Sequence, residues 1–408
     1  MTETLRPENA GQLRDALRWA AAEEQPLAVA GTGSKAALGR PTNVSARLEL
    51  AGLSGITNYE PEELVLTANA GTPIAEVREA LDEHGQVLGF DPPDYSALLG
   101  GRGSGTLGGV IATNLSGPGR IRVGAARDHL LGFAGVSGRG ESFKSGGRVV
   151  KNVTGYDLGK VIAGSFGTLA ALEEVSIKVM PKPEKVRTIV LLGLDEAAAT
   201  AALRDCANST FEPSGLAHLP EDIAAQSSIS YVAQAGTSVT AVRLEGPAAS
   251  VLERAAKLRA LYDARGASEE LHGHNSAAFW AEVRDALPFT RGAHAGCQVW
   301  RLSVPPAAGS EVAAKLRQGA KGACYFDWAG GLIWLAIDPR DDAAHDTVRA
   351  AIGETGGHAT LIRAAEEVRA RVPVFQPEPA PLAALTMRLK EAFDPRRVLN
   401  PGRMYQGV

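Results

Sequence analysis

The pattern of apolar and polar positions predicts an alternating helix and strand arrangement over the first 90 residues. Apolar side chains recur at i, i+3, i+4 and i+7 across residues 7–23, which is typical of an amphipathic helix. Short apolar runs at 27–30 and 64–70 predict two buried strands. Thr72 as N-cap and Pro73 at the first helical position then predict a second helix.

A regular pattern returns after Pro183 and predicts a second domain. Six elements in the order β-α-β-β-α-β are followed by six more in the same order, which is the split βαβ or ferredoxin-like unit. The expected strands are 188–194, 229–235, 238–244, 269–272, 298–304, 324–328, 332–338 and 359–363, and the expected helices are 195–207, 247–264, 306–318 and 343–352. We expect the two units to share one antiparallel sheet.

The segment between these regions is rich in glycine. Of the 46 glycines in the chain, 19 lie between Gly100 and Gly167, and strong helical periodicity is absent there until residues 156–163. Glycine lets the backbone approach a ligand closely and adopt positive φ. A local surplus within an ordinary composition indicates loops that surround a ligand.

Charge and cysteine content exclude several classes of protein. The net charge is −4 and no basic block is present, so a nucleic-acid partner is not expected. No apolar run is long enough for a spanning helix, and the N-terminus does not resemble a signal peptide. Cys206, Cys297 and Cys324 lie far apart, which excludes an iron–sulfur cluster or zinc site held by cysteines of this chain and favours a cytoplasmic location.

The first glycine loop, Gly31-Thr-Gly-Ser-Lys-Ala36, fits the dinucleotide pattern G-x-G-x-x-A. A Rossmann loop must open a helix, but Pro41 and the residues before it cannot continue one. Consecutive backbone N–H groups and a hydroxyl still favour an anion-binding loop. An ordinary turn between a strand and a helix is the alternative interpretation.

Further motifs follow this loop in order. They are VAGTGSK at 29–35, TLGGVIATN at 106–114, RVGAARD at 122–128, GGRVVKNVTGYDLGK at 146–160, GSFGTLA at 164–170 and FDPRRVLNPGR at 393–403. Many backbone amides and hydroxyls with few cations suit a long polar cofactor with a central pyrophosphate, whereas glycine turns of a β-sandwich are the alternative. The series resembles the FAD-binding domain shared by vanillyl-alcohol oxidase and p-cresol methylhydroxylase. Within that superfamily it resembles the FAD-binding E subunits of bacterial glycolate oxidases, and the segments 325–334 and 356–363 are similar to them as well.

This resemblance implies an α+β fold in three stretches of chain. Residues 1–183 would form a two-part FAD-binding domain, 184–375 a cap domain with the antiparallel sheet of two βαββαβ units, and 376–408 would return to the FAD-binding domain. Residues on the matching motifs would bind FAD: Ala30, Gly31, Thr32, Gly33, Ser34, Lys35, Thr106, Gly108, Gly109, Thr113, Asn114, Gly124, Asp128, Gly164, Gly167, Thr168, Leu169 and Asn400. Covalent members carry a histidine near the first loop, where this chain has Ser34 and Lys35, so we expect noncovalent FAD.

Catalytic residues are not assigned by these motifs. The metal-ligating H-x-G-D-G-N-x-H-like segment of related 2-hydroxy-acid dehydrogenases is missing. His272 and His274 could share a strand face and bind a metal, but surface histidines are the favoured interpretation and we expect no metal. Arg284 could hold a carboxylate, although its helical surroundings favour a packing role. Trp328 and Trp334 are expected in the core of the sheet.

The resemblance implies an FAD-dependent oxidoreductase acting on CH–OH groups. The chain would be the FAD-binding subunit of a complex that oxidises glycolate to glyoxylate, with an electron-relay or supporting role beside a catalytic flavoprotein subunit and an iron–sulfur subunit. The small 2-hydroxy acid would bind at the level of the complex, which would be cytoplasmic and could reach the inner face of the plasma membrane through partners. A self-sufficient FAD-dependent oxidase or dehydrogenase, and a structural subunit without flavin, are the alternatives.

Overall fold

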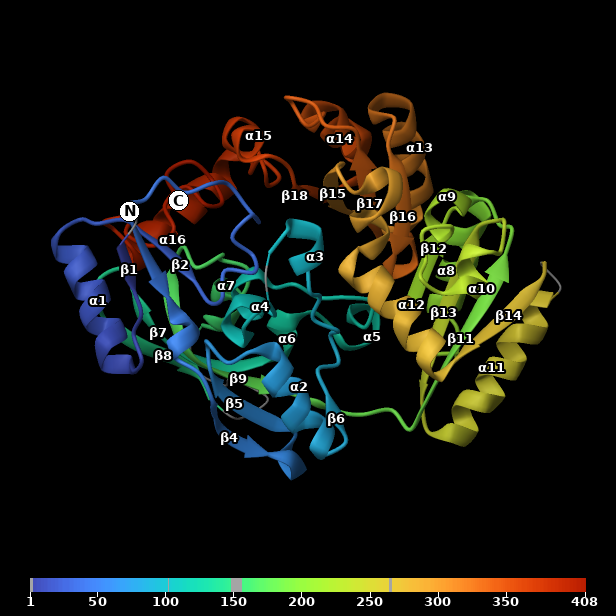
Figure 1. Cartoon of the computed structure of the whole chain (residues 1–408), viewed down its shortest axis with the longest axis horizontal. Helices are drawn as coiled ribbons and strands as arrows, with labels where there is room; N and C mark the ends of the chain where they lie inside the picture. Colours follow the sequence, from blue (N-terminus) through green and yellow to red (C-terminus); the bar gives the residue numbers. More distant parts are fainter. Residues whose placement is uncertain (1–2, 102, 148–155, 264–265) are drawn as a thin grey trace. The chain divides into compact units, whose positions relative to one another are not determined.

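The computed structural model describes residues 3–101, 103–147, 156–263 and 266–408. The chain divides into two compact units (Figure 1). Unit 1 combines Met1–Ser116, Gly124–Lys182 and Pro377–Val408, and unit 2 combines Gly117–Val123 and Pro183–Gln376. The short segment Gly117–Val123 therefore belongs to unit 2, although it interrupts the glycine-rich part of unit 1.

A small parallel sheet in unit 1 contains the strand that leads into the first glycine loop. Its order is β1-β3-β2, with β1 at Glu3–Leu5, β2 at Leu27–Ala30 and β3 at Ala46–Glu49. Helix α1 (Ala10–Ala22) packs Leu13 and Leu17 against this sheet. The helix begins later than residue 7 because the Asn9 side chain accepts from the Gln12 N–H and caps it.

A five-stranded antiparallel sheet forms the second part of unit 1. Its order is β4-β5-β9-β7-β8, with the strands at Ile56–Glu60, Val65–Asn69, Ala170–Lys178, Leu130–Ser137 and Ser142–Gly146, and a separate pair joins β6 (Gln86–Val87) to β10 (Met180–Pro181). Helix α2 (Ile74–Glu83) has Pro73 as its N-cap, so the expectation of Thr72 at that position is wrong. The Thr72 hydroxyl is engaged in the preceding turn, where it donates to the Asn69 carbonyl.

The glycine-rich segment contains more helix than the sequence predicts. Helix α3 (Ser96–Leu99) directly precedes this segment, and the unit 1 helices within it are short: α4 at Leu107–Thr113, α6 at Ala126–His129 and α7 at Gly159–Ile162. Helix α4 forms despite two glycines because the Thr106 hydroxyl caps the Gly109 N–H and Ile111 is buried. The helix expected at 156–163 is limited to α7, and the part of its motif at 148–155 lies outside the described residues.

Unit 2 is built on one eight-stranded antiparallel sheet in the order β14-β11-β13-β12-β16-β17-β15-β18. The strands are β11 Lys185–Leu192, β12 Gly215–Leu219, β13 Val239–Gly246, β14 Ser268–His272, β15 Gln298–Ser303, β16 Ala323–Asp327, β17 Leu332–Ile337 and β18 His358–Arg363. Each half has the β-α-β-β-α-β order, with helices α8 (Glu196–Ala207), α11 (Ala248–Asp263), α13 (Gly309–Ala320) and α14 (His345–Ile352). The halves meet between β12 and β16, where His218 pairs with Phe326, which confirms the expected shared sheet.

One predicted strand of unit 2 is wrong. Residues 229–235 form the short helix α10 (Ser230–Ala233), and the strand of this half is β12 instead. Glu282 accepts hydrogen bonds from the Ser227 hydroxyl and the Ser228 N–H, so a distant side chain fixes the turn that starts α10. The remaining helices are α5 Arg120–Val123, α9 Glu221–Ala224, α12 Gly273–Asp285 and α15 Glu366–Arg371.

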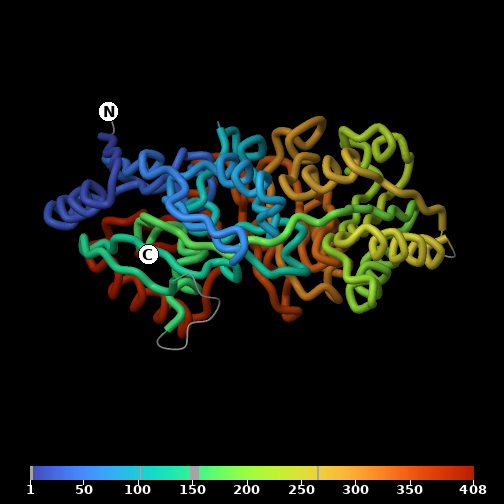
Figure 2. Tube along the Cα trace, turned by 90° about the horizontal axis from the view of Figure 1, so that it is seen from below, coloured from blue at the N-terminus to red at the C-terminus, as the bar shows by residue number. Residues whose placement is uncertain are grey.

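The C-terminal segment (red in Figure 2) returns to unit 1, where its tail pairs with the N-terminal strand β2. Helix α16 (Ala380–Phe393) precedes a tail in which Leu399 forms a parallel bridge with Leu27. The Asn400 N–H also donates to the Leu27 carbonyl at 3.0 Å. This return brings the final sequence motif next to the first one.

Candidate functional site

The loop after β2 presents backbone N–H groups that bind no protein acceptor. Within the described part of the chain, the N–H groups of Thr32, Gly33, Ser34 and Lys35 donate no hydrogen bond. Gly33 has a φ of +81°, which glycine adopts without strain. No helix follows the loop, so the structure agrees with the rejection of a Rossmann site. Consecutive free N–H groups of this kind form a nest that binds an anion.

Lys35 places a cation beside this nest. A Cβ added at Gly105 would collide with the Lys35 Nζ, so the ammonium lies directly against the Gly105 backbone. Burial lowers the pKa of Lys35, whereas the nearby Asp94 carboxylate acts to raise it. An ammonium that has lost hydration is stabilised by a bound anion.

Helix α4 approaches the same loop from the other side. A Cβ added at Gly31 would lie 2.5 Å from the Thr106 Oγ1. The Thr32 hydroxyl donates to the Ser104 carbonyl at 2.9 Å, which ties the loop to the start of α4. The Thr113 hydroxyl donates to the Gly109 carbonyl at 2.6 Å and is therefore engaged inside the helix. The sequence-predicted residues of the first loop and of α4 thus form two facing walls.

The turn before β9 forms a third wall. The Phe166 N–H donates to the Ala112 carbonyl of α4 at 2.8 Å. The Asn400 side chain accepts from the Val29 N–H at 2.8 Å and donates to the Phe166 carbonyl at 2.8 Å. Asn400 therefore connects β2 to this turn, which contains Gly164, Gly167, Thr168 and Leu169.

A buried ion pair that the sequence analysis missed supports the same turn. Lys390 and Asp394 are fully buried, and the Lys390 Nζ donates to Asp394 Oδ2 at 2.8 Å. The same ammonium donates to the Thr168 carbonyl at 2.8 Å and the Leu399 carbonyl at 2.9 Å. Burial lowers the pKa of Lys390, and Asp394 opposes this change. The sequence signal that could have revealed this pair is a lysine followed four residues later by an aspartate, at the end of a helix.

Gly124 and Asp128 lie at the turn into α6. The Asp128 carboxylate accepts from the Ala125 N–H and from the Lys160 ammonium, each at 2.8 Å. Burial acts to raise the pKa of Asp128, but these hydrogen bonds and the Lys160 charge lower it below its usual value. The turn is connected to α4 because the Arg127 N–H donates to the Asn114 Oδ1.

The eighteen predicted residues all belong to unit 1 and form one connected region. Hydrogen bonds within the protein already engage the side chains of Thr32, Thr106, Thr113, Asn114, Asp128, Thr168 and Asn400. These side chains shape the walls, and their direct contact with a cofactor stays a prediction. Among the described residues of the predicted set, the backbone N–H groups of Thr32–Lys35 and the Lys35 ammonium are the donors that remain open.

The other candidates from the sequence do not assemble into a site. His272 ends β14, whereas His274 lies in α12, so the two histidines do not share a strand face. Arg284 forms two hydrogen bonds with the neighbouring Asp285, at 2.8 and 2.7 Å. Among the described residues no group of three or more His, Cys, Asp or Glu side chains could hold a metal ion. Trp328 and Trp334 are buried in unit 2, as predicted.

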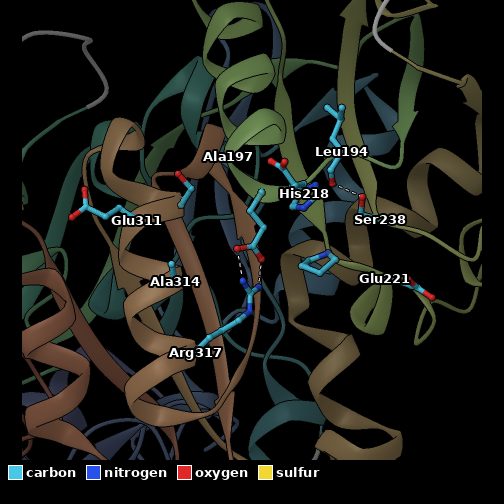
Figure 3. Close-up of a pocket in the computed structure, with 12 residues that line it drawn as sticks. Leu194, Ala197, His218, Glu221, Ser238, Glu311, Ala314 and Arg317 are labelled. Atoms are coloured by element: carbon cyan, nitrogen blue, oxygen red, sulfur yellow. Dashed lines mark hydrogen bonds and ion pairs between the residues drawn. The ribbon is translucent and has the colours of Figure 1, made fainter.

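A pocket of about 670 Å³ lies in unit 2, between the starts of α8 and α13 (Figure 3). Arg317 forms an ion pair with Glu196 across it, and His218 lies at its base. Burial and the Arg317 charge lower the pKa of His218 to about 4. The lining contains none of the eighteen predicted residues.

Comparisons with known proteins identify the class to which this fold and site belong. A family model described as FAD binding domain matches residues 3–146, and one described as FAD linked oxidases, C-terminal domain, matches residues 378–404. The fold is similar to p-cresol methylhydroxylase with substrate bound, with a TM-score of 0.73 at 15% identity over 98% of this chain and 88% of that chain. It is also similar to 4-ethylphenol oxidase from Gulosibacter chungangensis, with a TM-score of 0.72 at 13% identity over 99% and 89% of the two chains. The chain is thus an FAD-linked oxidoreductase with the p-cresol methylhydroxylase type of FAD-binding fold.

Sequence similarity defines the family more closely. The chain is 33% identical to glycolate oxidase subunit GlcE of Escherichia coli K12, over 96% of each chain. It is 27% identical to glycolate oxidase subunit GlcD of Bacillus subtilis 168, over 98% of this chain and 88% of that protein. A D-2-hydroxyglutarate dehydrogenase of Xanthomonas citri pv. viticola is 32% identical over 52% of this chain and 45% of its own length. The chain belongs to the family of the glycolate oxidase subunit GlcE.

Proposed function

We propose that this chain is the FAD-binding subunit of a complex that oxidises glycolate to glyoxylate. The proposal rests on the family, whose relatives GlcE and GlcD are subunits of glycolate oxidase. The structural observation that carries it is the run of open N–H groups at Thr32–Lys35 beside the Lys35 ammonium. These donors fit the pyrophosphate of FAD, because backbone N–H groups and one cation suit a doubly charged, elongated anion.

Each wall has a separate part in this proposal. The first loop and Lys35 would bind the pyrophosphate, and α4 with Asn114 would follow the ribityl chain. The turn at Gly164–Leu169, fixed by Asn400, would bound the adenine or ring end. When bound, FAD supplies a flavin ring that accepts a hydride equivalent, and the protein positions and tunes that ring. Ser34 and Lys35 occupy the place of the covalent histidine, so the cofactor would be held noncovalently.

We infer the partners of this chain from two kinds of site that its sequence lacks, a metal-ligating segment and a cysteine cluster. The metal-ligating segment of related dehydrogenases is missing, so a catalytic flavoprotein subunit would oxidise the substrate and this chain would relay electrons or support assembly. An iron–sulfur subunit would carry electrons onward, because the three cysteines are spread along the sequence. None of the described helices is both long and apolar enough to span a bilayer. We place the complex in the cytoplasm, with any contact to the membrane made through partners.

A spectroscopic experiment on the purified chain tests this function. We expect visible flavin absorbance that anaerobic glycolate does not bleach in the chain alone but does bleach when the partner subunits are added. Bleaching of the chain alone would instead show a self-sufficient oxidase or dehydrogenase. A colourless protein that does not take up added FAD would contradict both and indicate a structural subunit.

A further inference from the structure

A guanidinium without an acidic partner lies on the sheet of unit 2. Arg301 is in the middle of β15, and its Cζ lies 4.8 Å from the centre of the Trp328 ring. Its Nε is buried and has no hydrogen-bond partner. Within the described part of the chain Arg301 forms no ion pair or hydrogen bond through its side chain. Buried polar groups in native proteins are almost always paired, so this group needs an explanation.

A second arginine lies over the same indole, and a histidine lies near both guanidinium groups. The Arg120 Cζ lies 4.6 Å from the centre of the Trp328 ring. His358 pairs with Ser303 and Thr360 pairs with Arg301 in the β15–β18 ladder, so Arg301 and His358 point to the same face of the sheet. Loss of hydration and the charges of Arg301 and Arg120 lower the pKa of His358. Like charges gathered in this way repel one another, and a bound anion would relieve the repulsion.

The indole beneath these groups is held in an unusual backbone conformation. Trp328 and Ala329 have φ values of +53° and +58°, which side-chain-bearing residues rarely adopt. The Asp327 carboxylate accepts from the Trp328 N–H at 2.7 Å, and the indole N–H donates to the Gly117 carbonyl at 3.0 Å. Such strain persists where the surroundings impose it, and it concentrates at functional sites.

We propose that Arg301, together with the neighbouring Arg120 and His358, binds the carboxylate of a small 2-hydroxy or 2-oxo acid. A guanidinium stacked on an aromatic ring keeps its planar donor edge open, and that edge matches a carboxylate with two parallel hydrogen bonds. The identity of the acid rests on the proposed function, because glycolate and glyoxylate are carboxylates of this size. The negative charge of the ligand follows from the Arg301 guanidinium, which has no acidic partner among the described residues. The chain would thus have a carboxylate site that requires no metal.

Isothermal titration of the FAD-loaded protein with sodium oxalate tests this site, with inorganic phosphate as the comparison. We expect oxalate to bind the wild type at least about tenfold more tightly than Arg301→Met, because a hydrogen bond to a charged group contributes on this order. Arg301→Lys should be intermediate, because it keeps the charge but loses the planar fork. Arg259→Met, which removes an exposed charge from α11, should bind like the wild type.

Each other outcome overturns part of the proposal. Absent oxalate binding, or binding equal in wild type and Arg301→Met, would contradict the site. Phosphate binding as tight as oxalate, with the same dependence on Arg301, would overturn its assignment to a carboxylate. Circular dichroism recorded on the same samples reports folding, and their flavin absorbance separates the two proposals. A colourless protein that still binds oxalate through Arg301 would retain this site while the proposed function fails.

Discussion

Lys35 shows how single residues define the cofactor region. The motif GTGSK predicted an anion-binding loop from the sequence, because consecutive backbone N–H groups and a hydroxyl suit an anion, with an ordinary turn as the alternative. The structure adds that the N–H groups of Thr32–Lys35 are open and that the ammonium is pressed against Gly105. Gly105 is distant from Lys35 in the sequence, so this contact could not be predicted from the loop alone.

The first prediction concerns Lys35→Met. We expect this variant to bind FAD about ten- to one-hundredfold more weakly, because one charged hydrogen bond to the pyrophosphate is lost. Fluorescence titration of deflavinated protein with FAD measures the change. Lys257→Met, which removes an exposed ammonium that pairs with Glu253 on α11, serves as the matched control. An unchanged FAD affinity in Lys35→Met would remove this lysine from the cofactor site.

The second prediction concerns the pH dependence of the free energy of unfolding, through His218. Burial holds the His218 imidazole neutral in the native state, with a pKa of about 4 against an ordinary value of 6.5. The unfolded chain therefore binds an extra proton between these values, so stability is present above pH 6.5 and is lost as the pH falls through 4. The loss should be on the order of 3 kcal/mol relative to His218→Gln. Denaturant unfolding from pH 7 to pH 4 measures it.

His272→Gln is the control for this pH experiment, since that side chain is exposed. The control should keep the acid-dependent loss of the wild type. If His218→Gln shows the same pH dependence as the wild type, the pKa of His218 is not depressed in the native state.

At the scale of elements, the repeated order of unit 2 was predictable, but one of its strands was not. Apolar periodicity at 229–235 favoured a strand, whereas Glu282 of α12 binds the preceding serines and a helix forms. The strand that forms in this half is β12, which begins with Gly215 and contains His218. Its sequence therefore has only a weak preference for a strand. Helix α4 was missed for a similar reason, because its capping by Thr106 offsets the low helix propensity of its two glycines.

The third prediction concerns the buried ion pair at the end of helix α16 and the stability of the protein. Lys390→Met would leave the buried Asp394 carboxylate without its cation and the Thr168 and Leu399 carbonyls without their shared donor. We expect a loss of about 3–5 kcal/mol in the free energy of unfolding, measured with denaturant. Lys315→Met breaks the exposed pair with Glu311 and should leave the free energy of unfolding close to that of the wild type. Equal effects of the two substitutions would show that the buried pair does not hold the C-terminal segment.

For the whole molecule, the sequence motifs identify the cofactor far better than they identify the reaction. The FAD-binding motifs are local runs of residues, so the α+β class and the FAD-linked family could be inferred before the fold was known. The proposed carboxylate site combines Arg120, Arg301 and His358, which lie on three segments that only the fold of unit 2 brings together. Neither their charges nor the strain at Trp328 is visible in a linear motif, which is why the sequence assigned no catalytic or substrate residue.

The central claim is that this chain holds FAD noncovalently in unit 1. The most direct measurement is the visible absorbance spectrum of the purified chain, recorded before and after acid precipitation. We predict a flavin spectrum corresponding to about one FAD per chain, with the yellow colour released into the supernatant on denaturation. A chain that stays colourless after incubation with excess FAD, or whose flavin remains with the precipitate, would contradict the account.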